Sequence, residues 1–483
     1  MRDRCFCFVG WLIGFAAFAF CVPFAIAADD DASAVIMKAG AARVVITPDA
    51  ASLQHLTTVM GTKAKQIDHD IYARALVLND GTSRLVIVTY DLNCLDVATP
   101  ILRARCRDEL KIPPSHLILM ATHNHAAPIQ ICPENFAYGR GLADKIFDLI
   151  QAAIASEEGP ARISFGQGHN FHIRAVGNAP ADYDIHLLKA TVGDKTLAVL
   201  FNHPTHPLQS SKMHIDTGHP GYAVEFVEAA FPGSVAMYAD ACGGNQFPDQ
   251  GVIMYDAADQ VTAFGRQLGE SAVAIAQGET LDVTGKISST LEILSLPLAE
   301  PMSYDDAKLL AREKKVPLDI GFVPYPHPDR GTNWIRALLR HHEQKIPFPA
   351  RTTDRVCTDD EFLVEKLDDN REFPSKFEEV IVTTIGPLCF VAMQGEVCAP
   401  IGMRIKDAFR RQMPLFLGSY AGEHNLYIPT RELVRLDAYQ AQVIRIQYAS
   451  PVGWAPEVED EMVEGVFKIV TSMTGKNPER VVR

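Results

Sequence analysis

The chain has 483 residues and a formal net charge of −14, with 59 acidic against 45 basic side chains. This acidic balance argues against nucleic acid or an anionic membrane surface as a partner. No Ser/Gly-rich linker, internal repeat or low-complexity tract divides the sequence. We therefore expect one large domain, with two closely packed lobes as the alternative.

The first 28 residues carry the features of an export signal. Arg2 and Arg4 precede an uncharged, mainly apolar stretch that ends in small residues, and three aspartates follow it at once. This pattern predicts a secretory signal peptide over residues 1–28, a mature domain over 29–483, and export to the periplasm or the medium. An uncleaved membrane anchor is the alternative, because the stretch is long enough to span a bilayer. No later segment is.

Cysteine is not the residue that we expect to bind a metal here. Of the ten cysteines, three fall in the predicted signal, and the remaining seven show no C-x-x-C spacing. Buried thiols with one or two disulfides are the expectation, and the pairing cannot be read from the sequence.

Strands and helices alternate in the first half of the chain. Residues 84–90 form an apolar, β-branched run, residues 99–110 carry apolar side chains on one helical face, and residues 117–122 form a second strand. This β-α-β order predicts a parallel pair within an α/β fold. A second amphipathic helix is expected over 142–156.

The second half adds hairpins and further strands. A turn at Gly193 and another at Gly386 each separate two apolar runs, which predicts two hairpins. The helix that carries Trp334 is expected to face the core rather than a membrane surface. The further strands are expected at 185–191, 197–202, 235–240, 380–385, 388–393 and 414–420. Together these elements predict an α/β fold with a mixed β-sheet core flanked by helices.

Polar residues capable of chemistry follow several of these strands. In α/β proteins, ligands bind at the carboxyl ends of the strands, so we expect the site there. The residues in question are Asp91, the His123/His125 pair, His203, Glu396 and Tyr427.

Histidines crowd into one part of the chain. Six of the sixteen lie at positions 123, 125, 203, 206, 214 and 219. Alternation along a strand would send His123 and His125 to the same face. Zinc accepts neutral imidazole and carboxylate ligands, and His123, His203 and a later acid would supply them. A single histidine is more often a hydrogen-bonded core or surface residue, but three of them after separate strands favour a site.

Seven short segments of the chain, among them "ATHNHAAP" (121–128), "FNHP" (201–204) and "QGE" (394–396), resemble segments of the neutral, non-lysosomal ceramidases. Each segment alone is a weak signal, but their common order along most of the mature chain is specific. The segments are "ARVVITPD" (42–49), "IDHDIYARALVL" (67–78), "ATHNHAAP" (121–128), "FNHP" (201–204), "HPGYAVEFVE" (219–228), "QGE" (394–396) and "YIPT" (427–430).

The resemblance implies a ceramidase-like catalytic domain and assigns roles to individual residues. It implies a zinc ion whose ligands are His123, His203, Glu396 and Tyr427. It also implies that His125, Arg174 and Tyr439 hold the scissile carbonyl and its oxyanion. Tyr427 is the least usual of these ligands, and a buried ring with a hydrogen-bonded hydroxyl is its alternative role.

The sequence also departs from the family pattern. Ceramidases carry a Gly-Asp-x-Ser-Pro turn, whereas this chain has Asn245 at the acidic position and Phe247 at the serine position. The C-terminal β-sandwich domain of ceramidases is expected to be absent. We therefore expect an exported zinc hydrolase that cleaves the carbon–nitrogen bond of a small or lipid-like N-acyl substrate with activated water. A non-catalytic relative that binds a ligand in the same cleft, and a zinc esterase or lactonase, are the alternatives.

Overall fold

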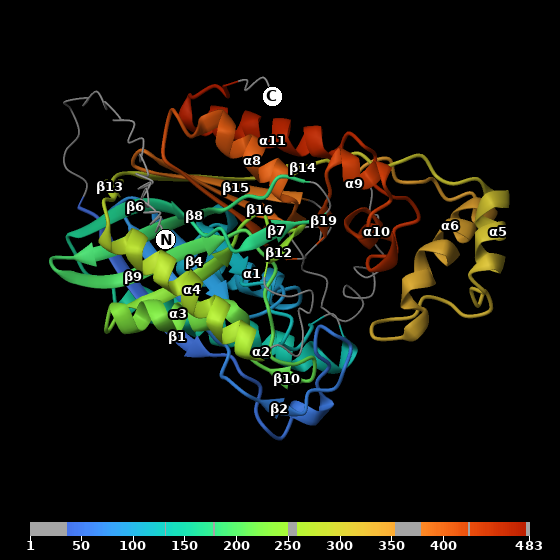
Figure 1. Cartoon of the computed structure of the whole chain (residues 1–483), viewed down its shortest axis with the longest axis horizontal. Helices are drawn as coiled ribbons and strands as arrows, with labels where there is room; N and C mark the ends of the chain where they lie inside the picture. The colour runs from blue at the N-terminus through green and yellow to red at the C-terminus, as the bar shows by residue number, and fades with distance from the viewer. Residues whose placement is uncertain are drawn as a thin grey trace, which may run out of the picture. The chain divides into compact units, whose positions relative to one another are not determined.

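Two stacked β-sheets form the centre of the fold, and helices cover the outer face of each (Figure 1). The computed structural model describes residues 36–130, 132–176, 179–249, 258–352, 378–423 and 426–479. The predicted signal peptide, residues 1–28, lies outside the described residues. So does Cys357.

The larger sheet is mixed. Its strands lie in the order β1 (Lys38–Val45), β3 (Tyr72–Asn79), β4 (Arg84–Tyr90), β5 (Leu117–Ala121), β18 (Leu415–Ala421), β16 (Leu388–Gln394), β15 (Glu378–Ile385) and β14 (Ile287–Leu294). β4 and β5 are parallel, as are β16 and β18, whereas the other neighbours are antiparallel. The predicted β-α-β unit is confirmed, because α1 (Ala98–Leu110) connects the parallel strands β4 and β5.

The second sheet is smaller and also mixed. Its strands lie in the order β11 (Val235–Asp240), β9 (Lys195–His203), β8 (Asp184–Val192), β6 (Ala161–His169) and β13 (Leu281–Asp282). β8 and β9 form the predicted hairpin, and Gly193 at its turn has φ +54°, where glycine is favoured. β9 and β11 are parallel and are joined through α3 (Gly218–Ala230).

Alternating side chains explain why the strands read as continuous apolar runs. In β4, Val86 and Val88 point to a core formed with α1 and α2 (Phe136–Ala155). Leu85 and Ile87, which alternate with these valines along the strand, point to a core shared with the smaller sheet. Both faces of the strand are therefore buried, which removes the polar alternation of a strand with one solvated face.

The helices cover the sheets in three groups. α1 and α2 lie over one half of the larger sheet, and α8 (Ala399–Phe409) and α11 (Val458–Thr474) lie over the other half. α3 and α4 (Ala258–Gln277) cover the smaller sheet. The mixed α/β architecture is as predicted, although α2 begins before the predicted residue 142.

A group of helices stands apart from the sheets at one end of the molecule (Figure 1). α5 (Tyr304–Glu313) and α6 (Asn333–Gln344) share an apolar cluster that buries Trp334, so this helix faces a core as predicted. α10 (Tyr439–Ile446) follows the short helix α9 (Arg431–Arg435) and contacts α6. No described helix has the length and apolarity needed to cross a membrane.

Short ladders complete the fold. They pair β2 (Gln66–Ile67) with β10 (His214–Ile215), β7 (Ile173–Ala175) with β12 (Gln246–Pro248), and β17 (Glu396–Val397) with β19 (Tyr427–Ile428). Single 3-10 turns lie at Leu53–His55, Pro114–His116, Pro133–Asn135 and Pro328–Thr332. The six described cysteines are all buried free thiols, so no disulfide forms among them.

The two halves of the larger sheet meet at one point. β5 and β18 are antiparallel and pair only through Met120 and Ala421, near the carboxyl end of each strand. The carboxyl ends of β5 and β18 therefore converge. The smaller sheet reaches the same place, because the side-chain amide of Asn202 in β9 donates to the carbonyl oxygen of Leu417 at 2.6 Å.

Candidate metal centre

The loop after β5 places His123 in an uncommon backbone conformation. β5 ends at Ala121, and His123 has φ +55°, in the left-handed region. This conformation costs a side-chain-bearing residue about 1–2 kcal/mol. The Asn124 amide fixes the loop by donating to the carbonyl oxygens of Asp91 and Asp216, at 3.1 and 2.6 Å. Strain held in this way is typical of a functional position.

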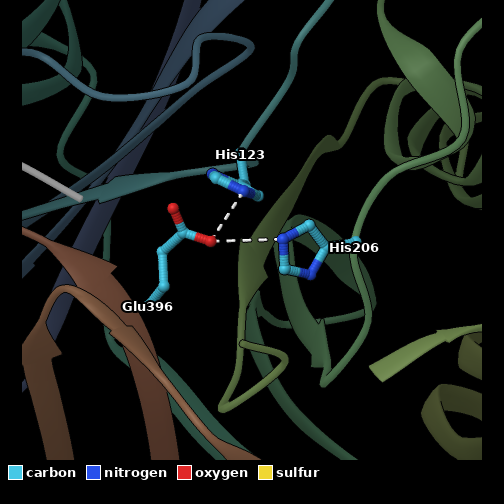
Figure 2. A group of neighbouring side chains, drawn as sticks. All are labelled: His123, His206 and Glu396. Atoms are coloured by element: carbon cyan, nitrogen blue, oxygen red, sulfur yellow. Dashed lines mark ion pairs between the residues drawn. The ribbon is translucent and has the colours of Figure 1, made fainter. Parts of the chain in front are cut away.

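Three buried side chains converge beside this loop (Figure 2). Oε2 of Glu396 lies 3.2 Å from Nε2 of His123 and 3.2 Å from Nε2 of His206. The candidate ligand atoms of the three residues all lie within 4.8 Å of one another. Segments far apart in the sequence thus bring two imidazoles and one carboxylate to a single point.

Hydrogen bonds at the far side of each ring orient the two imidazoles. Nδ1–H of His206 donates to the carbonyl oxygen of Gly243 at 3.0 Å, which leaves a lone pair on Nε2. The Asn93 amide contacts Nδ1 of His123 at 3.1 Å. Partners of this kind fix the ring orientation of metal-binding histidines.

Glu396 owes its position to the glycine before it. Gly395 has φ +82°, and a Cβ atom there would lie 2.4 Å from the carbonyl oxygen of Leu426. Burial opposes ionisation of the Glu396 carboxyl, but the facing imidazoles of His123 and His206 lower its pKa to about 2. The side chain is therefore a carboxylate at neutral pH.

The donor set fits a zinc ion. Among the described residues, Oε2 of Glu396 is buried without a well-aligned hydrogen bond, although two imidazole nitrogens face it. Two neutral imidazoles and one carboxylate are a ligand set of catalytic zinc sites, which keep a further position open for water or substrate. A cation at this point would pair with the buried carboxylate oxygen and lie within reach of both imidazoles.

His203, which the sequence analysis expected at the metal, is not in this group. It is the last residue of β9 and points to the same side as Val199 and Phe201, toward the core under α3 and α4. Its ring lies 6.4 Å from that of Phe264 in α4, and its Nε2 lies 3.4 Å from the carbonyl oxygen of Asn170. The chain turns after β9, and His206 enters the centre instead.

Tyr427 lies beside the group. Its hydroxyl is 2.8 Å from Nε2 of His206, and β19 pairs it with Glu396 in β17. Burial, together with the charge of Glu396, raises the pKa of Tyr427 well above its usual value. In this arrangement the group is a phenol that donates a hydrogen bond, so its predicted role as a fourth ligand stays a prediction.

His125 contacts the centre directly. Nε2 of His125 lies 3.0 Å from Nε2 of His123. The two rings meet as expected, but through the loop after β5 rather than by alternation along the strand, because β5 ends at Ala121. Burial, reinforced by the neighbouring rings of His123 and His206, lowers the pKa of His125 well below its usual value. The side chain is therefore a neutral imidazole with one N–H to donate.

The other two predicted carbonyl-binding residues lie at the edge of the centre. Tyr439 begins α10, is 51% exposed, and has its ring centroid 5.9 Å from that of Tyr427. Burial of the hydroxyl and the charge of Glu396 raise the pKa of Tyr439 to about 12. Arg174, in β7, is exposed and lies directly opposite Phe247 of β12, whose ring stacks on His206.

Sequence reasoning missed three members of this environment. His206 was visible as the second histidine of "HPTHP", and strand parity would have separated it from His203. Asn93 carries no such signal, because a single asparagine after a strand is common in loops. Tyr420 has its ring 4.4 Å from that of His123 and φ +56°, which the sequence does not indicate.

Solved ceramidase structures share this architecture. The crystal structure of neutral ceramidase from Pseudomonas aeruginosa superposes with a TM-score of 0.68 and 17% sequence identity, over 93% of this chain and 76% of that one. A ceramidase complexed with C2 gives a TM-score of 0.66 and 17% identity, over 93% and 77% of the two chains. This is the fold of the neutral ceramidases. The resemblance that the sequence segments suggested is thus confirmed at the level of the fold.

Comparisons of sequence alone give no match. No protein-family model matches the chain, and no curated protein shows significant similarity to it. At 17% identity the ceramidase likeness describes the fold, and the chemistry must be argued from the residues of this chain.

Proposed function

We propose that this protein is an exported, zinc-dependent hydrolase that cleaves the carbon–nitrogen amide bond of an N-acyl substrate. The observation that carries the proposal is the buried group of His123, His206 and Glu396 at the converging strand ends of a ceramidase-like fold. His123, His206 and Glu396 would hold the ion, with Tyr427 as a candidate fourth ligand. Export rests on the predicted signal over residues 1–28.

The ion would supply the chemistry that the side chains lack. When bound, zinc acidifies a water molecule and polarises an amide carbonyl. The residues of the chain would then position the substrate. His125 is neutral and can donate one N–H to the carbonyl oxygen, and Tyr439, whose pKa is about 12, can donate its hydroxyl. Donors already in place where charge develops lower the barrier.

Water is the nucleophile in this proposal because the chain has no hydroxyl at the ceramidase serine position. Phe247 stands there, and its ring stacks on His206. A lipid-like N-acyl substrate is favoured by the ceramidase fold and by the aromatic side chains around the centre.

The first test combines metal content with amide hydrolysis. Purified mature protein should contain one zinc per chain, cleave N-acyl amides, and lose both zinc and cleavage on chelation. His123→Ala and Glu396→Ala should each abolish zinc binding and leave the fold intact by circular dichroism. His342→Ala, on the distant helix α6, is the matched control and should keep both properties.

Each other outcome has a definite meaning. Stoichiometric zinc in both ligand variants would refute the site. Zinc without cleavage of any amide or ester would favour a ligand-binding protein, and cleavage of esters alone would make the protein an esterase or lactonase.

A further inference from the structure

The ring of Phe247 lies against a candidate metal ligand and also reaches solvent. Its centroid is 4.9 Å from that of His206, with 29° between the ring planes. The residues around it in β12 and the preceding loop, Asn245, Gln246 and Pro248, are buried, whereas Phe247 is partly exposed. Part of this residue is therefore accessible to a molecule that approaches the centre.

Backbone hydrogen bonds tie the segment of Phe247 to the candidate ligands. The amide of His206 donates to the carbonyl oxygen of Gln246 at 3.0 Å, and the carbonyl of Gly243 accepts from the His206 ring at 3.0 Å. The backbone that leads to Phe247 is therefore tied to His206.

The same segment is also tied to the strand of Glu396. The amide of Gly244 donates to the carbonyl oxygen of Val397 at 3.0 Å, and Oδ1 of Asn245 accepts from the amide of Ala399 at 2.8 Å. The backbone next to Phe247 is thus tied to the segments that supply two of the three candidate ligands, and the Phe247 ring forms a wall beside His206.

A cation lies on the same side of this wall. β7 and β12 are antiparallel, and Arg174 is directly opposite Phe247. Directly opposed residues in an antiparallel pair project to the same face, with Cβ atoms about 5 Å apart. Phe247 and Arg174 thus project to the same face of the ladder, and the ring of Phe247 stacks on His206, a combination suited to an apolar chain attached to a carbonyl.

We propose that Phe247 is a specificity-determining residue that contacts the apolar chain next to the scissile carbonyl. The inference rests on the proposed function, since it takes the metal centre as the place where the carbonyl binds. An apolar chain gains by leaving water for contact with the ring. Substrates whose acyl group is an aliphatic chain are therefore preferred over acetyl derivatives, and Phe247 supplies part of that preference.

Binding of hydroxamates to the zinc-loaded protein tests this without turnover. Acetohydroxamate and octanohydroxamate carry the same metal-binding group and differ only in the chain, and calorimetry gives the ratio of their Kd values. Wild type should favour octanohydroxamate. Phe247→Ala should reduce that ratio about tenfold, as expected when a chain loses its contact with a ring. Phe247→Leu, which keeps an apolar wall, should retain most of it.

Controls separate this proposal from the proposed function. Phe226→Ala removes a partly exposed ring from the outer helix α3 and should leave the ratio unchanged. All variants should keep one zinc per chain and a cooperative melt. A wild-type ratio in Phe247→Ala, or no chain preference in wild type, would overturn the role of Phe247 alone. Failure of zinc-loaded wild type to bind either hydroxamate would overturn the proposed function and this inference with it.

Discussion

Two polar clusters among the described residues differ in how far the chain completes them. In the first, Lys406 of α8 contacts Asp182 at 2.5 Å and also Asp184. Burial opposes ionisation of Lys406, but the two carboxylates raise its pKa. Asp184 also contacts His169 at 3.0 Å, and this hydrogen bond raises the pKa of His169. The chain itself supplies charges of both signs.

The second cluster is the candidate metal centre, where the chain supplies the carboxylate of Glu396 and the imidazoles of His123 and His206. Oε2 of Glu396 faces His123 and His206 but has no well-aligned hydrogen bond among the described residues. Buried charges are normally paired by the protein or by a metal. The comparison teaches that burial alone does not mark a functional site: the feature to look for is a buried charge that the described side chains leave without a well-aligned hydrogen bond.

The largest expected effect is the loss of stability when Lys406 is removed from its cluster with Asp182 and Asp184. Lys406→Met leaves Asp182 buried without its cation and should lower the free energy of unfolding by about 3–5 kcal/mol. Urea denaturation followed by circular dichroism measures it. Lys468→Met, at an exposed position of α11, is the control and should change stability by less than about 0.5 kcal/mol. A loss below 1 kcal/mol in Lys406→Met would show that the cluster is solvated.

The next prediction compares the zinc affinity of variants at His203 and His206, the two histidines of "HPTHP". His206→Ala should weaken zinc binding more than about 100-fold, or about 2.7 kcal/mol, because even indirect partners of a metal contribute 10- to 100-fold. His203→Ala, in the core under α3 and α4, should change zinc affinity by less than about threefold. Competition with a chromophoric chelator gives both values. The reverse order would restore His203 as the ligand that the family resemblance implied.

The last effect, about 1.4 kcal/mol for each pH unit, concerns acid stability. Burial lowers the pKa of His203 to about 4, whereas the unfolded chain takes up this proton near 6.5. Between pH 6.5 and 4 the unfolded state binds one more proton, so stability falls as the pH falls, by about 1.4 kcal/mol per pH unit. His203→Leu should remove that share of the slope. Urea titrations at several pH values measure it, and an unchanged slope would mean that the ring is protonated in the folded state.

The larger elements of the fold could be predicted because their residues obey simple periodicities. The strand over residues 84–90 has the predicted bounds, and the hairpin around Gly193 follows from its turn. The stacking of two sheets could not be predicted, because a strand buried on both faces reads alike whether helices or a second sheet cover it. Only the tertiary structure shows that Leu85 and Ile87 face the smaller sheet.

The site was predictable in part for a related reason. Strand ends and the ceramidase resemblance pointed to His123 and Glu396, which do come together, and to His203, which does not. Which of His203 and His206 reaches the candidate metal centre depends on where the strand ends. Because β9 includes residue 203, His203 faces the core, and the chain turns before it reaches His206. Arg174 and Tyr439 reach the edge of the centre through short ladders and helix starts, where boundaries are least certain from sequence.

The two halves of the larger sheet are paired only between Met120 and Ala421, close to the candidate metal centre. His123 follows one half of the larger sheet, Glu396 follows the other half, and His206 follows the smaller sheet. An ion held by all three would cross-link three parts of the scaffold where backbone pairing is thinnest. If an ion binds there, a substitution in a helix behind either half of the larger sheet is expected to change its affinity without altering a candidate ligand.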